Sequence, residues 1–347
     1  MRLLMITINI IIDYKKRFET KFTAIPYRSG FNKELLRQAF IKQGIEVNYI
    51  PFSDINFRNP NLKGQFFLAC ASEDHSGFYK SYIEDIILGL EQAGANVIPG
   101  FLQLKSHHNK LFMEIQRDLL HEESIKKIYS LHFGTIEELV SYKGNISWPV
   151  VFKPASGSMS KGVSLAHNMK ELKKAVIKVS RSPNIMNELK DKIRLLKYKG
   201  YIPESKYRKK YIIQTYIPNL TGDWKILVYG RKYYVLKRKN RENDFRASGG
   251  GRLSYERNLP EKILDFAEKI INAFHVPNIS LDIAYDGCEF YLLEFQFLYF
   301  GTYTIENSEF YFMKREQGWF RVEEKSILEE VYAESITNFI WDNYKKS

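Results

Sequence analysis

Strand-like and helix-like patterns alternate along the first part of the chain, up to about residue 105. Apolar residues with helical spacing run over 31–43, and Gly44 follows them as a glycine commonly follows a helix. A second helix is expected over 79–93, ending at Gly94. Short apolar runs predict strands at 45–50, 65–71 and 95–99. Strand–helix–strand order at this spacing predicts βαβ units and a parallel sheet, which places the fold in the α/β class.

The remainder of the chain contains both kinds of segment. We expect 106–147 to be mostly helical, with an amphipathic helix over 110–120. The later segments are expected to be a strand at 149–153, a basic helix at 169–179, strands over 211–283 interrupted by a helix at 260–274, and a closing helix at 323–344. These segments predict three domains, with the boundaries 1–105, 106–217 and 218–347.

The composition favours a folded, basic protein with anionic ligands. Apolar residues make up 44% and aromatic residues 15% of the 347 residues, as in packed globular chains. A net charge of +12 suits nucleotides, phosphorylated sugars, nucleic acid or anionic lipid. Part of this charge lies in a Lys- and Arg-rich stretch at 181–211. That stretch is either a solvated amphipathic insert or a patch that binds a partner or polymer.

The cysteines and the N-terminal segment bear on the compartment. Cys70 and Cys288 lie far apart without CxxC spacing, so neither a disulfide framework nor a zinc site is predicted. The apolar run 3–12 is too short to span a membrane and lacks a cleavage site, so it is expected to form a buried strand. We therefore expect a cytoplasmic protein without a transmembrane segment. Assembly into a homo-oligomer would suit a basic, aromatic-rich protein of this size.

A strand that ends in lysine and is followed by a loop of small residues predicts a phosphate site. The apolar run 150–152 leads to Lys153, and the loop Ser156-Gly157-Ser158-Met159-Ser160-Lys161-Gly162 follows. Glycine and serine allow backbone N–H groups to surround an anion, and Lys153 and Lys161 add positive charge. The spacing is not that of a P-loop, because Lys161 precedes Gly162. A plain hairpin turn would have a similar composition.

Two later strands predict a site for a divalent metal. Asp282 interrupts one apolar strand, and Glu294 and Gln296 interrupt the next. Glu294 and Gln296 are two residues apart, so their side chains point to one face, which Asp282 on a neighbouring strand can reach. Buried carboxylates are costly without a cation. Mg²⁺ on nucleotide phosphates is therefore expected, unless these residues face solvent at a sheet edge.

An apolar strand at 211–215 leads into a short connector, which can offer backbone C=O and N–H groups to adenine. With these elements in order, the chain resembles the ATP-grasp superfamily over roughly 109–302, and the branch of the ribosomal-protein glutamate ligases in particular. The motifs that carry the resemblance to that branch are Asp223-Trp224-Lys225, Val228-Tyr229-Gly230, Lys237-Arg238 and Asp244-Phe245-Arg246-Ala247-Ser248.

The resemblance implies an ATP-grasp fold. In that fold a parallel α/β pre-ATP-grasp domain precedes a central α+β subdomain with a glycine-rich lid and a C-terminal α+β subdomain with an antiparallel sheet. It also implies a reaction in which a substrate carboxylate attacks the γ-phosphate of MgATP. The acyl-phosphate formed is then attacked by an amine, which gives an amide, ADP and phosphate.

The resemblance implies roles for single residues as well. Contacts to the nucleotide are implied for Lys110, Lys153, Ser156, Gly157, Ser158, Ser160, Lys161, Gly162, Gln214, Thr215, Tyr216, Ile217 and Asp223. One or two Mg²⁺ ions would be held by Asp282, Glu294 and Gln296. The catalytic residues would be Lys153, Arg238 on the transferred phosphate, and Arg246 on the carboxylate substrate or the acyl-phosphate.

Two departures and two alternatives stand beside this assignment. Gln296 takes the place of the family's asparagine and keeps its amide oxygen, whereas Lys225 takes the place of an arginine and loses the bidentate fork. A phosphotransferase would use the same ATP site. A non-catalytic basic binding module is the other alternative, and the aromatic residues interleaved with lysine at 198–211 suit it. The expected substrates are small or polymer-linked carboxylates and amines, and no nucleic-acid motif is found.

The sequence leaves two alternatives for the role of each of two further segments. His75 follows the strand at 65–71, and it is either a ligand-facing residue or an ordinary loop residue. The aromatic tract 297–304 follows the predicted metal strand, and it either lines an acceptor pocket or belongs to the core.

Overall fold

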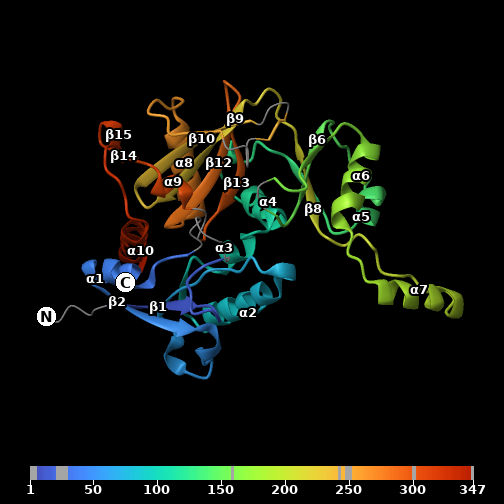
Figure 1. Ribbon diagram of the computed structural model, residues 1–347, viewed down its shortest axis with the longest axis horizontal. Coiled ribbons are helices and arrows are strands. Elements are labelled where there is room, and N and C mark those ends of the chain that lie inside the picture. The colour runs from blue at the N-terminus through green and yellow to red at the C-terminus, as the bar shows by residue number, and fades with distance from the viewer. Residues whose placement is uncertain are drawn as a thin grey trace. The chain divides into compact units, whose positions relative to one another are not determined.

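Figure 1 shows the fold of the protein in a computed structural model. The structure describes residues 6–20, 30–157, 160–240, 244–246, 252–298 and 302–344. Packing divides the chain into two compact units: unit 1 comprises Met1–His107, Leu120–Ile125 and Leu220–Ser347, and unit 2 comprises His108–Leu119 and Lys126–Asn219. The division into three domains stays a prediction.

A parallel sheet of four strands forms the N-terminal part of unit 1. In sheet order its strands are β2 (Ile45–Pro51), β1 (Ile6–Ile12), β3 (Phe66–Leu68) and β4 (Asn96–Ile98). The helices of this part are α1 (Lys33–Lys42), α2 (Phe78–Gln92) and α3 (Phe101–Ser106). Gly44, just beyond α1, has φ +75°, a left-handed conformation that glycine adopts without strain. The predicted βαβ arrangement and its parallel sheet are confirmed.

A second, antiparallel sheet forms the C-terminal part of unit 1 (Figure 1). In sheet order its strands are β13 (Phe290–Gln296), β12 (Asn278–Tyr285), β9 (Gly222–Tyr229), β10 (Lys232–Lys239), β14 (Tyr311–Arg315) and β15 (Gly318–Val322), and β11 (Leu253–Ser254) pairs with β10. Its helices are α8 (Ile263–Phe274), α9 (Tyr303–Glu306) and α10 (Leu328–Tyr344).

One large apolar core joins the two sheets of unit 1. Phe40 of α1, Ile336 of α10 and Ile10 of β1 belong to a single buried cluster, together with Leu227 of β9 and Tyr234 of β10. Each of these side chains is less than 1% exposed. Burial of large apolar side chains is the main stabilising contribution, so this core fixes the sheets of unit 1 against each other.

Unit 2 contains an antiparallel sheet of four strands. In sheet order these are β5 (Ser130–Phe133), β8 (Tyr211–Thr215), β6 (Val150–Pro154) and β7 (Ser164–Ala166). The helices of unit 2 are α4 (Lys110–Asp118), α5 (Ile136–Ser141), α6 (Met169–Ser180) and α7 (Ile185–Lys197). Phe152, Leu172 and Tyr211 lie at the centre of its apolar core.

The structure corrects two expectations about secondary structure. The segment 106–147 is not mostly helical, since it contains β5 between α4 and α5. The hairpin of β14 and β15 was not predicted at all. Cys70 and Cys288 are not joined in a disulfide. Among the residues described, no helix has the length and apolar character needed to cross a membrane.

Candidate functional site

Four charged side chains lie on one face of the antiparallel sheet of unit 1. Asp282 of β12 pairs with Lys225 of β9, and Asp223 of β9 pairs with Arg238 of β10. Paired residues on neighbouring strands share a face, as do residues two apart on one strand. All four side chains therefore point to the same side. We call Asp223, Lys225, Arg238 and Asp282 the charged cluster.

The guanidinium group of Arg238 holds the charged cluster together. Its Nε and Nη2 atoms donate to the two carboxylate oxygens of Asp223, at 2.6 and 2.8 Å. Nη2 also lies 2.7 Å from Oδ2 of Asp282. Lys225 donates from Nζ to Oγ of Ser280 at 2.9 Å and to Oδ1 of Asp282 at 3.3 Å. Because a bidentate pair fixes the plane of the guanidinium, Arg238 has a defined orientation.

Burial and ion pairing shift the pKa values of this cluster in opposite directions. Burial raises the pKa of Asp223, and the charge of Arg238 offsets only part of that rise. Burial also acts to raise the pKa of Asp282, but Arg238 and Lys225 outweigh it and hold that pKa well below its usual range. At Arg238 burial acts to lower the pKa, but the two carboxylates outweigh this effect and raise the pKa above its usual value. Asp282 and Arg238 are therefore charged at neutral pH.

Two further polar residues extend the same face onto β13. Glu294 lies directly opposite Asp282, and Gln296 lies opposite Ser280, as their spacing predicts. Two carboxylates and an amide oxygen are hard donors of the kind that Mg²⁺ prefers, so these three residues fit the implied metal in chemistry. Within the described ranges, no group of three or more His, Cys, Asp or Glu residues is arranged to hold a metal. The amide oxygen of Gln296 would therefore be needed in the ligand set.

The charge of Asp282 is compensated differently from the expectation. The predicted reason for a metal was that these buried carboxylates need a cation, but Arg238 and Lys225 already supply positive charge to Asp282. That argument for the metal is therefore wrong for Asp282. The assignment of Asp282, Glu294 and Gln296 as metal ligands stays a prediction.

Arg246, predicted to meet the carboxylate substrate, pairs with an acid of its own loop. Its Nε and Nη2 atoms donate to the carboxylate of Asp244, at 2.9 and 2.6 Å. The remainder of that motif, from Ala247 onward, lies outside the described residues until Arg252. Its role toward a substrate stays a prediction.

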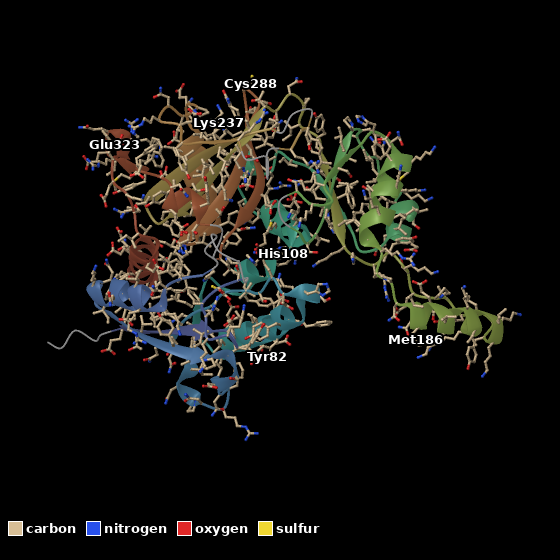
Figure 2. The ribbon with its side chains drawn as sticks, in the orientation of Figure 1. Tyr82, His108, Met186, Lys237, Cys288 and Glu323 are labelled. Carbon is tan, nitrogen blue, oxygen red and sulfur yellow. The ribbon has the colours of Figure 1, made fainter. Side chains whose placement is uncertain are left out.

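In unit 2, the start of α4 lies against the loop that follows β6. Lys110 donates from its backbone N to the carbonyl of Ala155 at 2.7 Å, and from Nζ to the carbonyl of Gly157 at 2.8 Å. Gly157 in turn donates its N–H to Nε2 of His108 at 3.0 Å; His108 is labelled in Figure 2. Two elements that the sequence placed more than forty residues apart are thus in direct contact.

The loop itself adopts the conformations that its glycines allow. Gly157 has φ +129°, Gly162 has φ +76°, and Ser160 has φ +56°. Ser156 and Lys161 are exposed, whereas Ser158 lies outside the described residues. Left-handed conformations turn backbone N–H groups in directions that a regular strand does not, which suits an anion-binding loop.

Lys153 precedes this loop on β6. It is half-buried and lies opposite Ile212 of β8. This register places the predicted phosphate lysine on the strand next to the predicted adenine hinge, inside unit 2. Its role in binding phosphate stays a prediction.

Gln214, one of the predicted hinge residues, uses its side chain inside the core of unit 2. It donates from Nε2 to Oε2 of Glu114 at 2.7 Å and to Oγ of Ser130 at 3.3 Å. Arg117 donates from Nη2 to Glu114, to Oγ of Ser130 at 3.0 Å and to the carbonyl of Ile128 at 2.7 Å. We call Glu114, Arg117, Ser130 and Gln214 the buried network, since none is more than 9% exposed.

The other hinge residues lie at the end of β8. Thr215 is exposed and donates its N–H to the carbonyl of Tyr129 at 3.0 Å. Tyr216 and Ile217 follow it and are half-buried. Binding of adenine by the backbone C=O and N–H groups of this segment stays a prediction.

A pocket that was not predicted lies at the carboxyl ends of β1 and β3 in unit 1, with a volume of about 430 Å³. Ligands of open α/β sheets bind at this end of the strands. The acidic and basic side chains that line it are Asp13, Lys15, Arg17, Glu19, Glu73, Asp74 and His75. Lys15 lies 2.7 Å from Glu19, and Arg17 lies 3.6 Å from the same carboxylate. His75, for which a ligand-facing role and an ordinary loop position were both left open, lies in the lining of this pocket.

The sequence does carry a signal for this pocket. Residues 13–19 place five charged residues directly after an apolar strand, where a parallel sheet presents its loops. Asp74 also caps α2, because its carboxylate accepts from the N–H groups of Tyr79 and Lys80, each at 3.0 Å. These bonds outweigh the effect of burial and lower the pKa of Asp74.

Comparison with known proteins finds similarity in structure rather than in sequence. No protein-family model matches the chain, and no curated protein sequence matches it. A D-cycloserine synthetase has a similar structure, with 10% identity and a TM-score of 0.52 over 96% of this chain and 99% of that one. An ATP-grasp protein with a RimK domain from Sphaerobacter thermophilus DSM 20745 has 14% identity and a TM-score of 0.46, over 85% and 92% of the two chains. An N5-carboxyaminoimidazole synthetase from Staphylococcus aureus has 12% identity and a TM-score of 0.49, over 96% and 77%.

Proposed function

We propose that this chain, which has the ATP-grasp fold, is an ATP-dependent ligase that joins a carboxylate to an amine. Its predicted α/β class, with a parallel sheet and antiparallel sheets, is confirmed. The carboxylate would attack the γ-phosphate of ATP to form an acyl-phosphate and ADP. The amine nitrogen would then attack the acyl carbon, and inorganic phosphate would leave as the amide forms.

The charged face of the antiparallel sheet is the observation that carries this proposal. Asp282 and Glu294 lie opposite each other, and Gln296 is two residues further along the same face. When bound, Mg²⁺ would supply the positive charge that stabilises a transferring phosphoryl group. Asp282, Glu294 and Gln296 would hold it, while Arg238 keeps Asp282 ionised and in place.

Arg238 would also steady the transferred phosphoryl group. Its two bonds to Asp223 fix the guanidinium, so the group is oriented before any substrate arrives. Preorganised positive charge lowers the cost of charge development in the transition state without requiring a nucleophile from the protein. Arg246 would meet the substrate carboxylate after exchanging its contact with Asp244.

Unit 2 would bind the nucleotide. Lys110 and Lys153 would contact the phosphates, and the loop at 156–162 would cover them and exclude water from the acyl-phosphate. The hydrogen bond from Lys110 to the carbonyl of Gly157 supports this, because it holds a predicted phosphate ligand against the loop. The backbone of 214–217 would contact the adenine.

The pocket at the ends of β1 and β3 would bind one of the two substrates. Its lining carries both signs of charge, with Lys15 and Arg17 beside Asp13 and Glu19. Such a lining suits a small molecule that has both an amine and a carboxylate, since each group would find an opposite charge.

Trapping of the acyl-phosphate tests the proposal. Purified protein would be incubated with MgATP, hydroxylamine and pools of amino acids or sugar acids, and both ADP and hydroxamate would be measured. We expect hydroxamate that depends on one carboxylate, is lost in Glu294→Gln, and is retained in Glu316→Gln, which changes an exposed glutamate in the turn between β14 and β15.

The alternatives give different results in the same assay. ADP release without hydroxamate would identify a phosphotransferase. Absence of any substrate-stimulated ADP release over broad pools, with nucleotide binding unchanged in Glu294→Gln, would leave the non-catalytic binding module.

A further inference from the structure

The segment that precedes β8 carries much of the charge of the chain. Residues 181–210, which we call the basic insert, contain ten Lys and Arg residues and three Asp and Glu residues. The difference is +7, out of +12 for the whole chain. The ten cationic residues are Arg181, Lys190, Lys192, Arg194, Lys197, Lys199, Lys206, Arg208, Lys209 and Lys210.

The helix of the basic insert, α7, stands apart from the core of unit 2. It begins at the N-cap Asn184, whose side chain accepts from the N–H of Asn187 at 3.1 Å. All thirteen residues of α7 are described, and none of them is buried. Figure 1 shows α7 away from α5 and α6, and Figure 2 labels Met186 on it.

Large apolar side chains form a continuous exposed stripe along α7. At 3.6 residues per turn, positions 185, 189, 193 and 196 fall on one side, with position 186 beside them. The exposed fractions of these side chains are 77% for Ile185, 64% for Met186, 53% for Leu189, 62% for Ile193 and 91% for Leu196. The same spacing places Lys192 on one flank of the stripe and Lys190 and Lys197 on the other.

The acidic residues of α7 lie outside the stripe, and both contact other parts of the basic insert. Asp191 accepts from the hydroxyl of Tyr201 at 2.6 Å. Glu188 lies 3.5 Å from both Arg181 and Lys206. The two negative charges of the helix are thus engaged inside the basic insert. The outward face is left with aliphatic side chains bordered by lysines.

We infer that this face of α7 binds the surface of an anionic lipid bilayer, with the helix lying parallel to the surface. An interfacial helix of this kind buries an aliphatic stripe among the acyl chains while flanking lysines reach the anionic headgroups. The net charge of +7 complements such a surface, which attracts clustered lysines over the distance of a Debye length. The inference goes beyond the proposed ligase activity and does not depend on it.

Three other occupants fit the face less well. A second copy of the chain would bring two inserts of charge +7 together, and like charges repel. A nucleic acid would use the lysines but leave the five aliphatic side chains without partners. An acidic protein would need a groove that encloses a single convex helix, whereas a bilayer accepts the stripe as it stands.

Sedimentation with lipid vesicles tests this inference on the full chain. We expect binding to phosphatidylcholine vesicles that contain about one-third phosphatidylglycerol, and little binding to phosphatidylcholine alone. The variant Leu189→Asp/Ile193→Asp should bind the anionic vesicles at least about tenfold more weakly. Leu35→Asp/Ile41→Asp is the matched control, because Leu35 and Ile41 are 45% and 57% exposed on α1 and the change in net charge is the same, and it should bind as the wild type does.

A second pair of variants separates the contribution of the lysines from that of the aliphatic stripe. Lys190→Glu/Lys197→Glu should weaken vesicle binding, and more so than Lys174→Glu/Lys178→Glu, which makes the same change in net charge on exposed positions of α6. Unchanged circular dichroism and melting temperature would show that each variant is folded.

Three results would overturn the inference. Wild-type protein that fails to bind anionic vesicles would do so directly, as would equal binding by wild type and Leu189→Asp/Ile193→Asp. A dimer in analytical ultracentrifugation that these aspartates convert to monomer would instead assign the face to a second copy.

Discussion

Each unit buries an arginine against acidic side chains, on the helix α4 in unit 2 and on the antiparallel sheet in unit 1, and the two arrangements differ in their surroundings. In unit 2, Arg117 contacts the buried carboxylate of Glu114, and its Nε also lies 3.9 Å from the exposed carboxylate of Asp118. In unit 1, Arg238 faces two carboxylates, those of Asp223 and Asp282. In unit 2, Glu114 also accepts from Gln214 and Ser130 of the buried network. The arrangement in unit 1 adjoins Glu294 and Gln296 of β13, which lie on the same face of the sheet.

The neighbours of each arginine make the difference explicit. In unit 1, Glu294 lies opposite Asp282, and Gln296 follows on the same face, so two carboxylates and an amide lie together beside Arg238. Such oxygen atoms are hard donors of the kind that Mg²⁺ prefers, whereas Glu114 in unit 2 is engaged by Arg117 and Gln214 of its own network. We therefore predict that the arginine is structural in unit 2 and supports ion binding in unit 1.

Removal of Arg238 should have the largest effect. Arg238→Met leaves Asp223 and Asp282 close together without their main cation, and loss of one partner from a buried ion pair costs about 3–5 kcal/mol. We expect the free energy of unfolding to fall by at least this range, measured by urea denaturation, together with loss of any ligase activity. Arg231→Met, at an exposed arginine in the turn between β9 and β10, should leave both unchanged.

The same variant should acquire a characteristic pH dependence. Burial already raises the pKa of Asp223, and without Arg238 that pKa should rise further. A carboxyl with a raised pKa holds a proton in the folded state that it has lost in the unfolded state. The stability of Arg238→Met should therefore decrease as pH rises from about 4, the unfolded value, to the raised pKa. A midpoint in urea that does not change between about pH 5 and about pH 8 would contradict this account.

Disruption of the buried network should lower the free energy of unfolding about as much as removal of Arg238 does. A second substitution should restore most of that loss. Arg117→Met leaves Glu114 buried without its cation, and should cost about 3–5 kcal/mol. In Glu114→Gln/Arg117→Met no charge remains, so most of the loss should be recovered and activity retained. The corresponding double change in unit 1, Asp282→Asn/Arg238→Met, should recover stability without activity. If Asp282→Asn/Arg238→Met were active, the charged cluster of unit 1 would be structural in the same way as the buried network of unit 2.

The sequence predicted the parts of the fold that local spacing determines. Helical periodicity and Gly44 suffice for α1, because capping and amphipathicity are local properties. In contrast, β5 is only four residues long, and it is a strand because Ser130 pairs with Gln214 of β8, far along the chain. The hairpin of β14 and β15 did carry a signal, in two short aromatic-rich runs at 310–313 and 319–322 on either side of a polar turn that ends at Gly318.

In the candidate site, too, local spacing predicted some features, whereas others depend on the order of the strands. The period of two along a strand predicted that Glu294 and Gln296 share a face, and the pairing of β12 with β13 agrees. The contact of Arg238 with Asp282 depends on the sheet order β12-β9-β10, which no local spacing contains. The compensation of Asp282 by Arg238 and Lys225 was for this reason not foreseen.

Added Mg²⁺ provides a more moderate test of the predicted metal ligands in unit 1. An ion that binds only the folded state stabilises by about 2.7 kcal/mol at 100 times its dissociation constant. We expect Mg²⁺ with ADP to raise the melting temperature of the wild type and of Glu114→Gln/Arg117→Met, but not that of Glu294→Gln. An equal rise in Glu294→Gln would show that the ion binds elsewhere.

The smallest expected effect concerns the loop after β6. Gly157 has φ +129° and Gly44 has φ +75°, so alanine at either position should cost about 1–2 kcal/mol of backbone strain. A Cβ at Gly157 would have only the carbonyl oxygen of Lys161 nearby, at 3.7 Å, and one at Gly44 would meet nothing within 4 Å, so crowding adds little in either case. Gly157→Ala should in addition raise the KM for ATP, because Lys110 and His108 both bond to the backbone of Gly157. Gly44→Ala should leave that KM unchanged, and an equal change in both variants would mean that the loop affects stability alone.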